Sequence, residues 1–284
     1  MDPALTPPAL NVRALLRAYQ LRPHKGLGQN FLIDQAALRK LTEAAEIEPL
    51  AEVLEIGPGV GSLTVWLAGA ARRVVAVELD GQLMPILEQV LAEAKNVSLV
   101  HGDILKIKPE SLLESDGYLV VANIPYYITS AIIRHLLESK PRPARLVLTM
   151  QREVAERICA QMGDLSLLAL SVQVYGHPRA VLRIPAGAFY PAPKVDSVTL
   201  RVDLYPQPLV PPENLPTFFR LAKAGFSQKR KTLRNALAGS LGWNRQQIND
   251  LLEQAEIDPQ RRAETLSLDE WKRLTDEYLD RGGH

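Results

Sequence analysis

Residues Glu52–Gly61 read EVLEIGPGVG, a short apolar stretch followed at once by glycines at positions 57, 59 and 61. An apolar run of this length bounded by glycine is typical of a buried strand of a parallel sheet. Glycines after such a strand let the backbone approach a ligand closely, and we expect a helix from about Ser62 whose amino end favours polar groups. The stretch therefore predicts a strand–loop–helix unit that binds a ligand.

Similar short β-branched runs recur along the chain and alternate with helical stretches, which is typical of an α/β fold with a parallel sheet. We expect strands at Glu52–Ile56, Val74–Glu78, Val97–His101, Tyr118–Ala122 and Leu146–Met150, with Ala180–Ile184 and Ser197–Asp203 forming the far edge of the sheet. We expect helices at Leu83–Glu93, Ser130–Leu137 and Glu153–Ala160.

The alternation ends at a proline-rich stretch, YPQPLVPPENLP, which begins at Tyr205. Beyond it the sequence reads as helical, and we expect Ser267 to be the N-cap of LDEWKRLTDEYL. We therefore predict an N-terminal extension over residues 1–24, an α/β domain over 25–204 and a small all-α C-terminal domain over 205–284.

Composition limits the possible functions of this 284-residue chain. Cys159 is the single cysteine, which excludes an internal disulfide or a cysteine-based metal cluster, and the five histidines lack metal-binding spacing, so we expect no metal. No leader pattern or 18-residue apolar run is present, so we expect a cytoplasmic protein with no membrane partner. No unusual apolar stripe calls for a second copy, so we expect a monomer.

Charge is nearly balanced overall, with 33 basic and 32 acidic residues, but it is unevenly distributed. Arg220–Arg234 carries six basic residues and no acid, and the first forty residues are also biased towards basic side chains. A polyanion could therefore meet two local patches, although such runs are also common on solvated helix faces.

The glycine loop departs from the dinucleotide fingerprint G-x-G-x-x-G, because Ser62 stands at the third glycine position. Its E-x-G-x-G-x-G form instead resembles motif I of S-adenosylmethionine-dependent methyltransferases of the Rossmann-like class I. Glu78 closes the next strand, where a carboxylate can accept both ribose hydroxyls. Asp103 follows the third strand, where such methyltransferases often place an acid against the adenine amine. The order of these elements predicts a cofactor site, and the resemblance implies that the cofactor is S-adenosyl-L-methionine.

The tetrapeptide Asn123–Tyr126, NIPY, follows the fourth predicted strand. An exocyclic adenine amine is a poor nucleophile because its lone pair is delocalised, and an amide oxygen plus a backbone carbonyl could accept its two hydrogens. Asn123 suits that task, Pro125 would hold the turn, and Tyr126 could stack on the base. The motif resembles that of methyltransferases that act on amino groups of planar ring systems.

Four segments in order are similar to one family, the ribosomal RNA adenine dimethyltransferases. They are Gly26–Asp34, Val53–Thr64, Asn123–Ser130 and Phe189–Arg201, and the similarity resumes at Phe218–Leu237. The resemblance implies transfer of two methyl groups to N6 of each of two adjacent adenosines near the 3′ end of small-subunit rRNA, within an immature small ribosomal subunit.

The resemblance also implies roles for individual residues. Its cofactor contacts fall on Asn30, Leu32, Gly57, Gly59, Glu78, Asp103 and Asn123. Its catalytic pocket for the target base falls on Asn123, Pro125, Tyr126 and Phe189. Its RNA-binding residues fall on Lys229, Arg230, Lys231 and Arg234, which would contact phosphates without reading sequence.

Three alternatives stay open at this point. Ile124 stands where the small-subunit enzymes usually carry Leu, while the large-subunit methyltransferases of the macrolide-resistance type often carry Ile. A non-catalytic RNA-binding assembly or transcription factor could share the fold, although it would not need the cofactor ligands. A DNA adenine methyltransferase fits the NIPY chemistry, but about eighty helical residues without an obvious reader of bases in the grooves fit it poorly.

Overall fold

The computed structural model describes residues 7–283, so the first six residues of the predicted N-terminal extension lie outside it. The chain divides into two compact units. The first comprises the described residues up to Ala155 together with Pro178–Leu204, and the second comprises Glu156–His177 together with the chain from Tyr205 onward.

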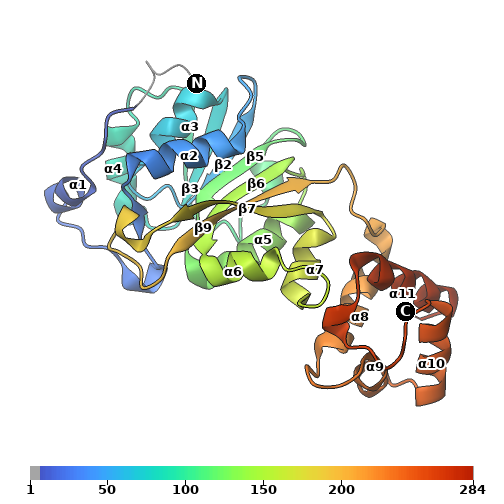
Figure 1. Cartoon of the computed structure of the whole chain (residues 1–284). Helices are drawn as coiled ribbons and strands as arrows, with labels where there is room; N and C mark the ends of the chain where they lie inside the picture. Colours follow the sequence, from blue (N-terminus) through green and yellow to red (C-terminus); the bar gives the residue numbers. More distant parts are fainter. Residues whose placement is uncertain (1–6, 284) are drawn as a thin grey trace. The chain divides into compact units, whose positions relative to one another are not determined.

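The first unit contains a seven-stranded sheet in the order β4-β3-β2-β5-β6-β9-β7 (Figure 1). Its strands are β2 (Glu52–Ile56), β3 (Arg73–Glu78), β4 (Val97–His101), β5 (Leu119–Asn123), β6 (Arg145–Gln151), β7 (Gly176–Ile184) and β9 (Ser197–Leu204). The five strands from β4 to β6 pair in parallel, while β9 pairs antiparallel with β6. The predicted α/β class with a parallel sheet is confirmed.

The sheet is covered on both faces, because β2 is buried at all five positions although successive side chains point to opposite sides. One face packs against α2 (Gln35–Ala45) and α3 (Thr64–Ala70) through a core that includes Leu38, Trp66 and Val121. Helices α4 (Met84–Val90) and α5 (Thr129–Glu138) also belong to this unit, and the boundary between the two units falls within α6 (Arg152–Ile158). Burial on both faces explains the apolar β-branched runs of the sequence.

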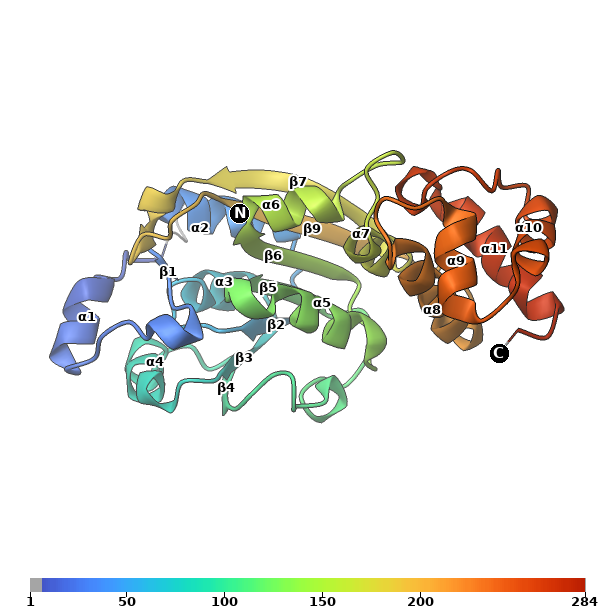
Figure 2. The same cartoon turned by 90° about the horizontal axis from the view of Figure 1, so that it is seen from below.

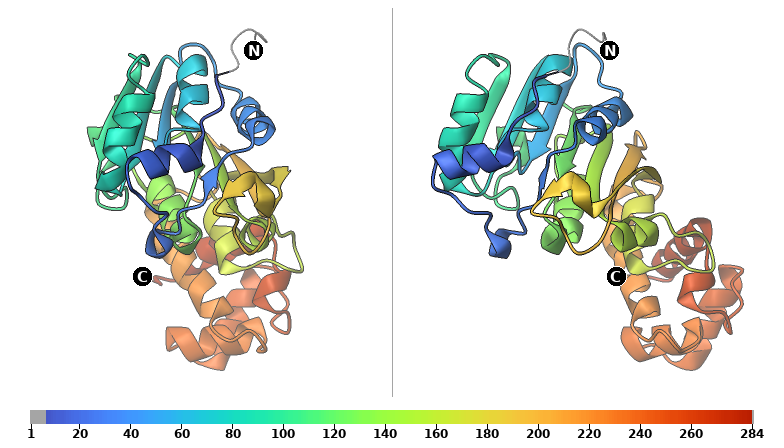
Figure 3. Two further views of the ribbon diagram at one scale, coloured as in Figure 1. Left: turned by 90° about the vertical axis from the view of Figure 1, so that its left-hand side faces the viewer. Right: turned by 60° about the vertical axis from the view of Figure 1, so that its left-hand side comes forward.

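Residues 11–28 form a segment that we call the N-terminal strap, which contains α1 (Val12–Ala18) and a turn of 3₁₀ helix at Lys25–Leu27. Figure 3 shows α1 beside α4. The buried Val12 and Leu16 join a small apolar cluster with Ile86 of α4. The strap leads into β1 (Phe31–Leu32), which pairs antiparallel with β8 (Phe189–Tyr190).

The second unit is helical, with α7 (Leu167–Gln173), α8 (Leu215–Phe226), α9 (Leu233–Leu241), α10 (Arg245–Gln254) and α11 (Leu268–Asp280) (Figure 2). Its largest fully buried side chains are Trp271 and Phe218. The predicted N-cap at Ser267 is confirmed: its hydroxyl accepts the Glu270 N–H at 3.2 Å, and the Glu270 carboxylate accepts the Ser267 N–H at 2.7 Å. This reciprocal capping box fixes the start of α11.

Several boundaries differ from the sequence expectation. The segment Glu156–His177 belongs with the helical unit, whereas the predicted α/β domain contained it, because α7 packs against α8. Helix α3 begins at Thr64 instead of Ser62, because the glycine loop continues through Gly61 and Ser62 before the helix forms. The two late strands lie at the far side of the sheet as predicted, with β7 as the edge strand there and β9 between β7 and β6. No helix within residues 7–283 is both long and apolar enough to span a membrane.

Candidate active site

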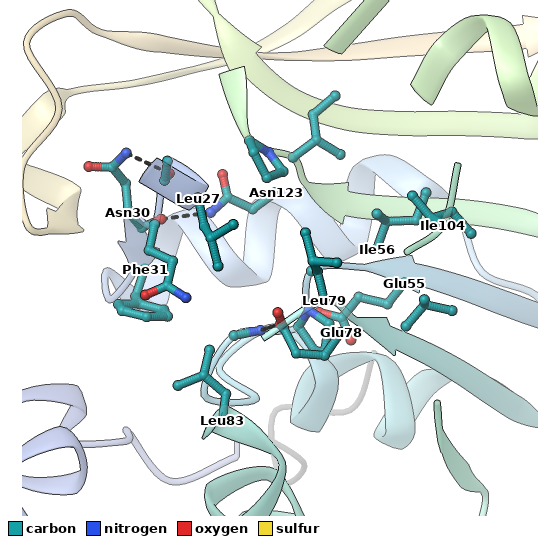
Figure 4. A pocket seen from close by; sticks show the side chains of 18 of the residues that line it. Leu27, Asn30, Phe31, Glu55, Ile56, Glu78, Leu79, Leu83, Ile104 and Asn123 are labelled. Atoms are coloured by element: carbon teal, nitrogen blue, oxygen red, sulfur yellow. Dashed lines mark hydrogen bonds between the residues drawn. The ribbon is translucent and has the colours of Figure 1, made fainter. Parts of the chain in front are cut away.

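A pocket lies where the carboxyl ends of the parallel strands β2, β3 and β5 meet the segment before β1 (Figure 4). Open α/β sheets bind ligands at this edge. Nine residues singled out from the sequence line it, namely Asn30, Leu32, Gly57, Gly59, Glu78, Asp103, Asn123, Pro125 and Tyr126. The structure thus brings together residues that are up to 96 positions apart, from Asn30 to Tyr126.

The glycine loop forms one wall of this pocket. Gly57 and Gly59 have φ of 69° and 63°, in the left-handed region that favours glycine. A Cβ on Gly59 would lie 2.8 Å from the ring of Phe31, so a side chain there would collide with the opposite wall. Gly61 does not line the pocket. A Cβ on Gly61 would lie 3.2 Å from a methyl group of Val90 of α4, so this glycine allows that helix to pack closely.

Glu78 holds this loop against the end of β3. Its carboxylate accepts the Gly59 N–H at 2.9 Å and the Asp80 N–H at 2.8 Å, one bond to each oxygen. Burial raises the pKa of Glu78, and the two backbone N–H groups partly oppose that rise. Each carboxylate oxygen keeps a second acceptor position, so the side chain can still accept two hydroxyl groups.

Glu55 and Ser62 are pocket residues that sequence reasoning did not assign to the site. Glu55 is 1% exposed, and one of its oxygens and the Ser62 hydroxyl have no hydrogen-bond partner among residues 7–283. Burial raises the pKa of Glu55 to about 8, an effect partly offset by the Thr64 hydroxyl and increased by the Glu78 carboxylate. Glu55 belongs to the quoted glycine motif, but only the fold shows that its carboxyl group is buried and incompletely paired.

Asn123 lies at the last position of β5, and its amide orientation is set by a long-range contact. Its Nδ2 donates to the backbone carbonyl of Asn30 at 2.9 Å, and the Asn30 side chain donates to the Gly28 carbonyl at 3.0 Å (Figure 4). Because the amide nitrogen is committed to Asn30, the amide oxygen is the atom that is available to accept a hydrogen from a ligand. This arrangement matches the chemistry expected of the NIPY motif.

The aromatic residues after Asn123 lie at the same pocket. Tyr126 is partly buried, and its hydroxyl bonds to the Ser197 hydroxyl at 2.5 Å. Burial raises the pKa of Tyr126, so its hydroxyl stays neutral near pH 7. Tyr127 also lines the pocket and is 58% exposed, which places it at the rim.

Phe189 occupies a different place from the one expected. It is 3% exposed, pairs with Leu32 in the β1–β8 ladder, and belongs to the apolar core instead of the pocket lining. The backbone pairing with Leu32 explains the difference. Leu32 lines the pocket, and the Phe189 ring lies in the apolar core that also contains Leu32. As it stands, Phe189 supports the pocket from behind.

Asp103 and the predicted RNA-binding residues lie in loops or in the first turn of a helix. Asp103 follows β4, and its Oδ1 accepts the Leu105 N–H at 3.0 Å. Lys229, Arg230 and Lys231 are exposed in the loop between α8 and α9, whereas the half-buried Arg234 lies in the first turn of α9. None of these four basic residues forms an ion pair within the described part of the chain.

The pocket suits S-adenosyl-L-methionine. It has a positive-φ glycine wall, apolar side chains such as Leu79 and Ile104, a strand-end carboxylate at Glu78, and the unpartnered Glu55 oxygen that calls for a polar ligand. Together with the sheet topology, these features define a Rossmann-like class I S-adenosylmethionine-dependent methyltransferase, as predicted.

Comparison with known proteins identifies the family. The model of the ribosomal RNA adenine dimethylase family matches residues 20–278. Proteins named ribosomal RNA small subunit methyltransferase A include one from Dehalococcoides mccartyi, 47% identical and covering 95% of this chain and 94% of its own. Another, from Moorella thermoacetica, is 44% identical and covers 97% and 98%. The chain belongs to the ribosomal RNA adenine dimethylase family and is an S-adenosylmethionine-dependent enzyme.

Solved structures show the same fold. A dimethyladenosine transferase from Plasmodium falciparum has a TM-score of 0.77 and 27% identity, covering 89% of this chain and 98% of its own. A 23S rRNA methyltransferase, ErmE, has a TM-score of 0.71 and 28% identity, covering 87% and 99%.

Proposed function

We propose that this enzyme transfers two methyl groups to N6 of each of two adjacent adenosines near the 3′ end of small-subunit (16S) rRNA. The curated relatives at 44–47% identity, which are named for the small subunit, support this substrate. The observation that carries the chemistry is that Asn123, Pro125 and Tyr126 line the same pocket as the glycine loop and Glu78. The groups suited to a target base and to the cofactor thus share one pocket.

Asn123 is the residue that activates the amine. Its oxygen accepts one hydrogen of the adenine N6 amine, since its nitrogen is held by the Asn30 carbonyl at 2.9 Å. A backbone carbonyl of Ile124 or Pro125 accepts the second hydrogen. These two bonds favour a pyramidal nitrogen whose lone pair points at the methyl group, so catalysis consists mainly of orientation and selective hydrogen bonding.

When bound, S-adenosyl-L-methionine supplies an electrophilic methyl group. Asn30, Leu32, Gly57, Gly59, Glu78 and Asp103 are the residues that we propose to hold it, together with Asn123. A methylated exocyclic amine is acidic enough in its cationic form to lose its proton to water. The mechanism therefore needs no general base from the protein.

Tyr126 is the residue that we propose to stack on the target base, because its ring lines the pocket and its hydroxyl is tethered to Ser197. A splayed adenosine can enter such a pocket, as in other enzymes that act on unstacked bases. A direct stacking contact from Phe189 would require its ring to leave the core, so we assign it the support of Leu32 and the pocket wall.

The basic loop of the helical unit is the part that we propose to dock on rRNA. Lys229, Arg230 and Lys231 are exposed, and with Arg234 they would contact phosphates, which gives affinity that depends on salt but reads little sequence. Specificity then comes from RNA shape. The substrate that we propose is the rRNA within an immature small ribosomal subunit in the cytoplasm, methylated by a monomeric enzyme.

The test is methyl transfer from labelled S-adenosyl-L-methionine to two substrates, followed by nucleoside digestion. One substrate is immature small subunits lacking the modification, and the other is protein-free large-subunit rRNA. We expect N6,N6-dimethyladenosine from the small subunit alone, formed about 10²–10³-fold more slowly by an Asn123→Ala variant. Product from large-subunit rRNA alone would favour a resistance methyltransferase. Cofactor binding without transfer to either would favour a non-catalytic assembly factor.

A further inference from the structure

We propose that the N-terminal strap is a second RNA-contact surface, which binds phosphates next to the nucleotide whose base enters the pocket. This inference rests on the proposed function, since it presumes an RNA substrate. The strap is separate from the basic loop at 229–231, which lies in the helical unit.

The strap carries charge of one sign only. Between Asp2 and Asp34 the sequence contains no Asp or Glu, whereas the strap holds Arg13, Arg17, Arg22 and Lys25. All four side chains are exposed, and none makes an ion pair with any residue from 7 to 283. Arg13 and Arg17 stand four residues apart on α1, where like charges repel one another and an anion would relieve the repulsion.

The strap is held in place before any ligand arrives. Val12 and Leu16 are buried against Ile86, and the Tyr19 hydroxyl bonds to the Gln89 side chain at 2.6 Å. Further along, the His24 N–H donates to the Gln29 side chain at 2.7 Å, and the same side chain donates to Asp80 at 2.7 Å. An ordered basic surface loses less conformational entropy on binding than a flexible tail would.

The strap also ends at the pocket. Leu27 and Gly28 line it, and a Cβ on Gly28 would lie 3.3 Å from the ring of Tyr127 at the rim. Lys25 is three residues before Gly28, so their Cα atoms are at most about 11 Å apart. Arg22 and Arg17 continue the basic series earlier in the strap. A strand whose base enters the pocket would therefore pass close to the basic end of the strap.

Arg13 shows how a strap cation can be prepared for a phosphate. Its guanidinium lies over the Tyr190 ring, 4.7 Å from the centroid. Stacking uses the face of the guanidinium and leaves its N–H edge free to bind a phosphate oxygen. Because this contact also supports the fold, Arg13 is kept unchanged in the test.

The test compares two variants of equal charge in the full-length protein. The strap variant combines Arg17→Gln, Arg22→Gln and Lys25→Gln. The control combines Lys40→Gln, Lys95→Gln and Lys140→Gln, three exposed lysines elsewhere on the first unit. Affinity for a transcript of the 3′ domain of small-subunit rRNA is measured between 50 and 200 mM salt, and affinity for S-adenosyl-L-methionine is measured by calorimetry.

We expect the strap variant to lower the slope of log affinity against log salt by about 2, since each lost contact to a single strand removes roughly 0.7. Over this salt range the unchanged protein would then lose roughly 20-fold more affinity than the strap variant. The control should keep the parental slope, and both variants should bind the cofactor normally.

Three results would overturn the strap contact: an unchanged slope, an equal reduction in the control, or a loss confined to cofactor affinity. The last would show that the strap only supports the pocket. Absence of specific RNA binding by the unchanged protein would instead refute the proposed function, so the two failures are distinguishable.

Discussion

Replacing Glu78 with Gln tests the assignment of the cofactor pocket most directly. The carboxylate accepts one backbone N–H on each oxygen, from Gly59 at 2.9 Å and from Asp80 at 2.8 Å. An amide has a single oxygen, so in Glu78→Gln the Nε2 group must face one of these two N–H donors. The same change leaves one acceptor instead of two for the ribose hydroxyls.

The expected loss of cofactor affinity follows from the loss of one hydrogen bond to a charged acceptor, which contributes about 1.5–3 kcal/mol. We therefore expect cofactor affinity to fall by about 10- to 150-fold. Folding stability should change less, by within about 2 kcal/mol, because an unpaired buried N–H is destabilising while removal of the charge relieves desolvation. Glu78 is buried, and this burial raises the pKa of its carboxyl group.

Calorimetry with S-adenosyl-L-methionine measures the affinity, and denaturant unfolding measures the stability. Glu52→Gln is the matched control, because Glu52 is also a buried strand glutamate, paired with Arg73 at 3.1 Å at the opposite end of β2. That control should be less stable but bind the cofactor normally. Affinity of Glu78→Gln within threefold of the unchanged protein would refute the assignment of Glu78 to the cofactor.

Four further predictions follow from the site and the basic loop. Asn123→Ala should slow methyl transfer by about 10²–10³-fold in single-turnover assays, and a near-normal rate would contradict its role. Tyr126→Ala should lower kcat/KM by about 5- to 150-fold through lost stacking, whereas Tyr126→Phe should stay within about tenfold; equal losses would argue against stacking. Burial raises the pKa of Glu55 from 4.5 to about 8, so the folded protein favours the neutral carboxyl group. This contribution to folding stability is fully present below pH 4.5 and is lost as the pH rises towards 8. The unfolding free energy of the unchanged protein relative to Glu55→Gln should thus fall by roughly 1 kcal/mol per pH unit from pH 5 to 8, and parallel curves would contradict this. Replacing residues 229–231 with Ala should weaken rRNA binding and lower its salt slope by about 2, and an unchanged slope would remove this loop from the interface.

Much of the fold could be predicted because its signals are local. The run at Glu52–Ile56 was predicted as a strand with the bounds that the structure shows, and Val97–His101 likewise. The predicted strand Leu146–Met150 is one residue too short at each end, because β6 extends from Arg145 to Gln151. Hydrophobic periodicity and flanking glycines indicate that a strand is present, but they do not show at which residue its pairing with neighbouring strands ends.

The pocket was also largely predictable, because parallel strands bring their carboxyl ends to one edge of a sheet. Gly57, Glu78, Asp103 and Asn123 each follow or end a strand, so their convergence follows from the order of the strands. Glu55 was missed because a strand residue two positions before the turn has no local signature of incomplete pairing.

Sequence alone therefore determined the α/β class, the glycine loop and the identity of the residues at the strand ends, because these depend on neighbours within a few positions. Tertiary structure decided what depends on pairing across long separations. The Asn30 carbonyl accepts a hydrogen bond from the Asn123 amide, 93 residues later in the chain, and so fixes its orientation. The backbone of Phe189 pairs with that of Leu32, and its ring lies in the core. Residues 156–177 join the helical unit for the same reason. Such contacts form only when the whole chain packs, so no local pattern encodes them.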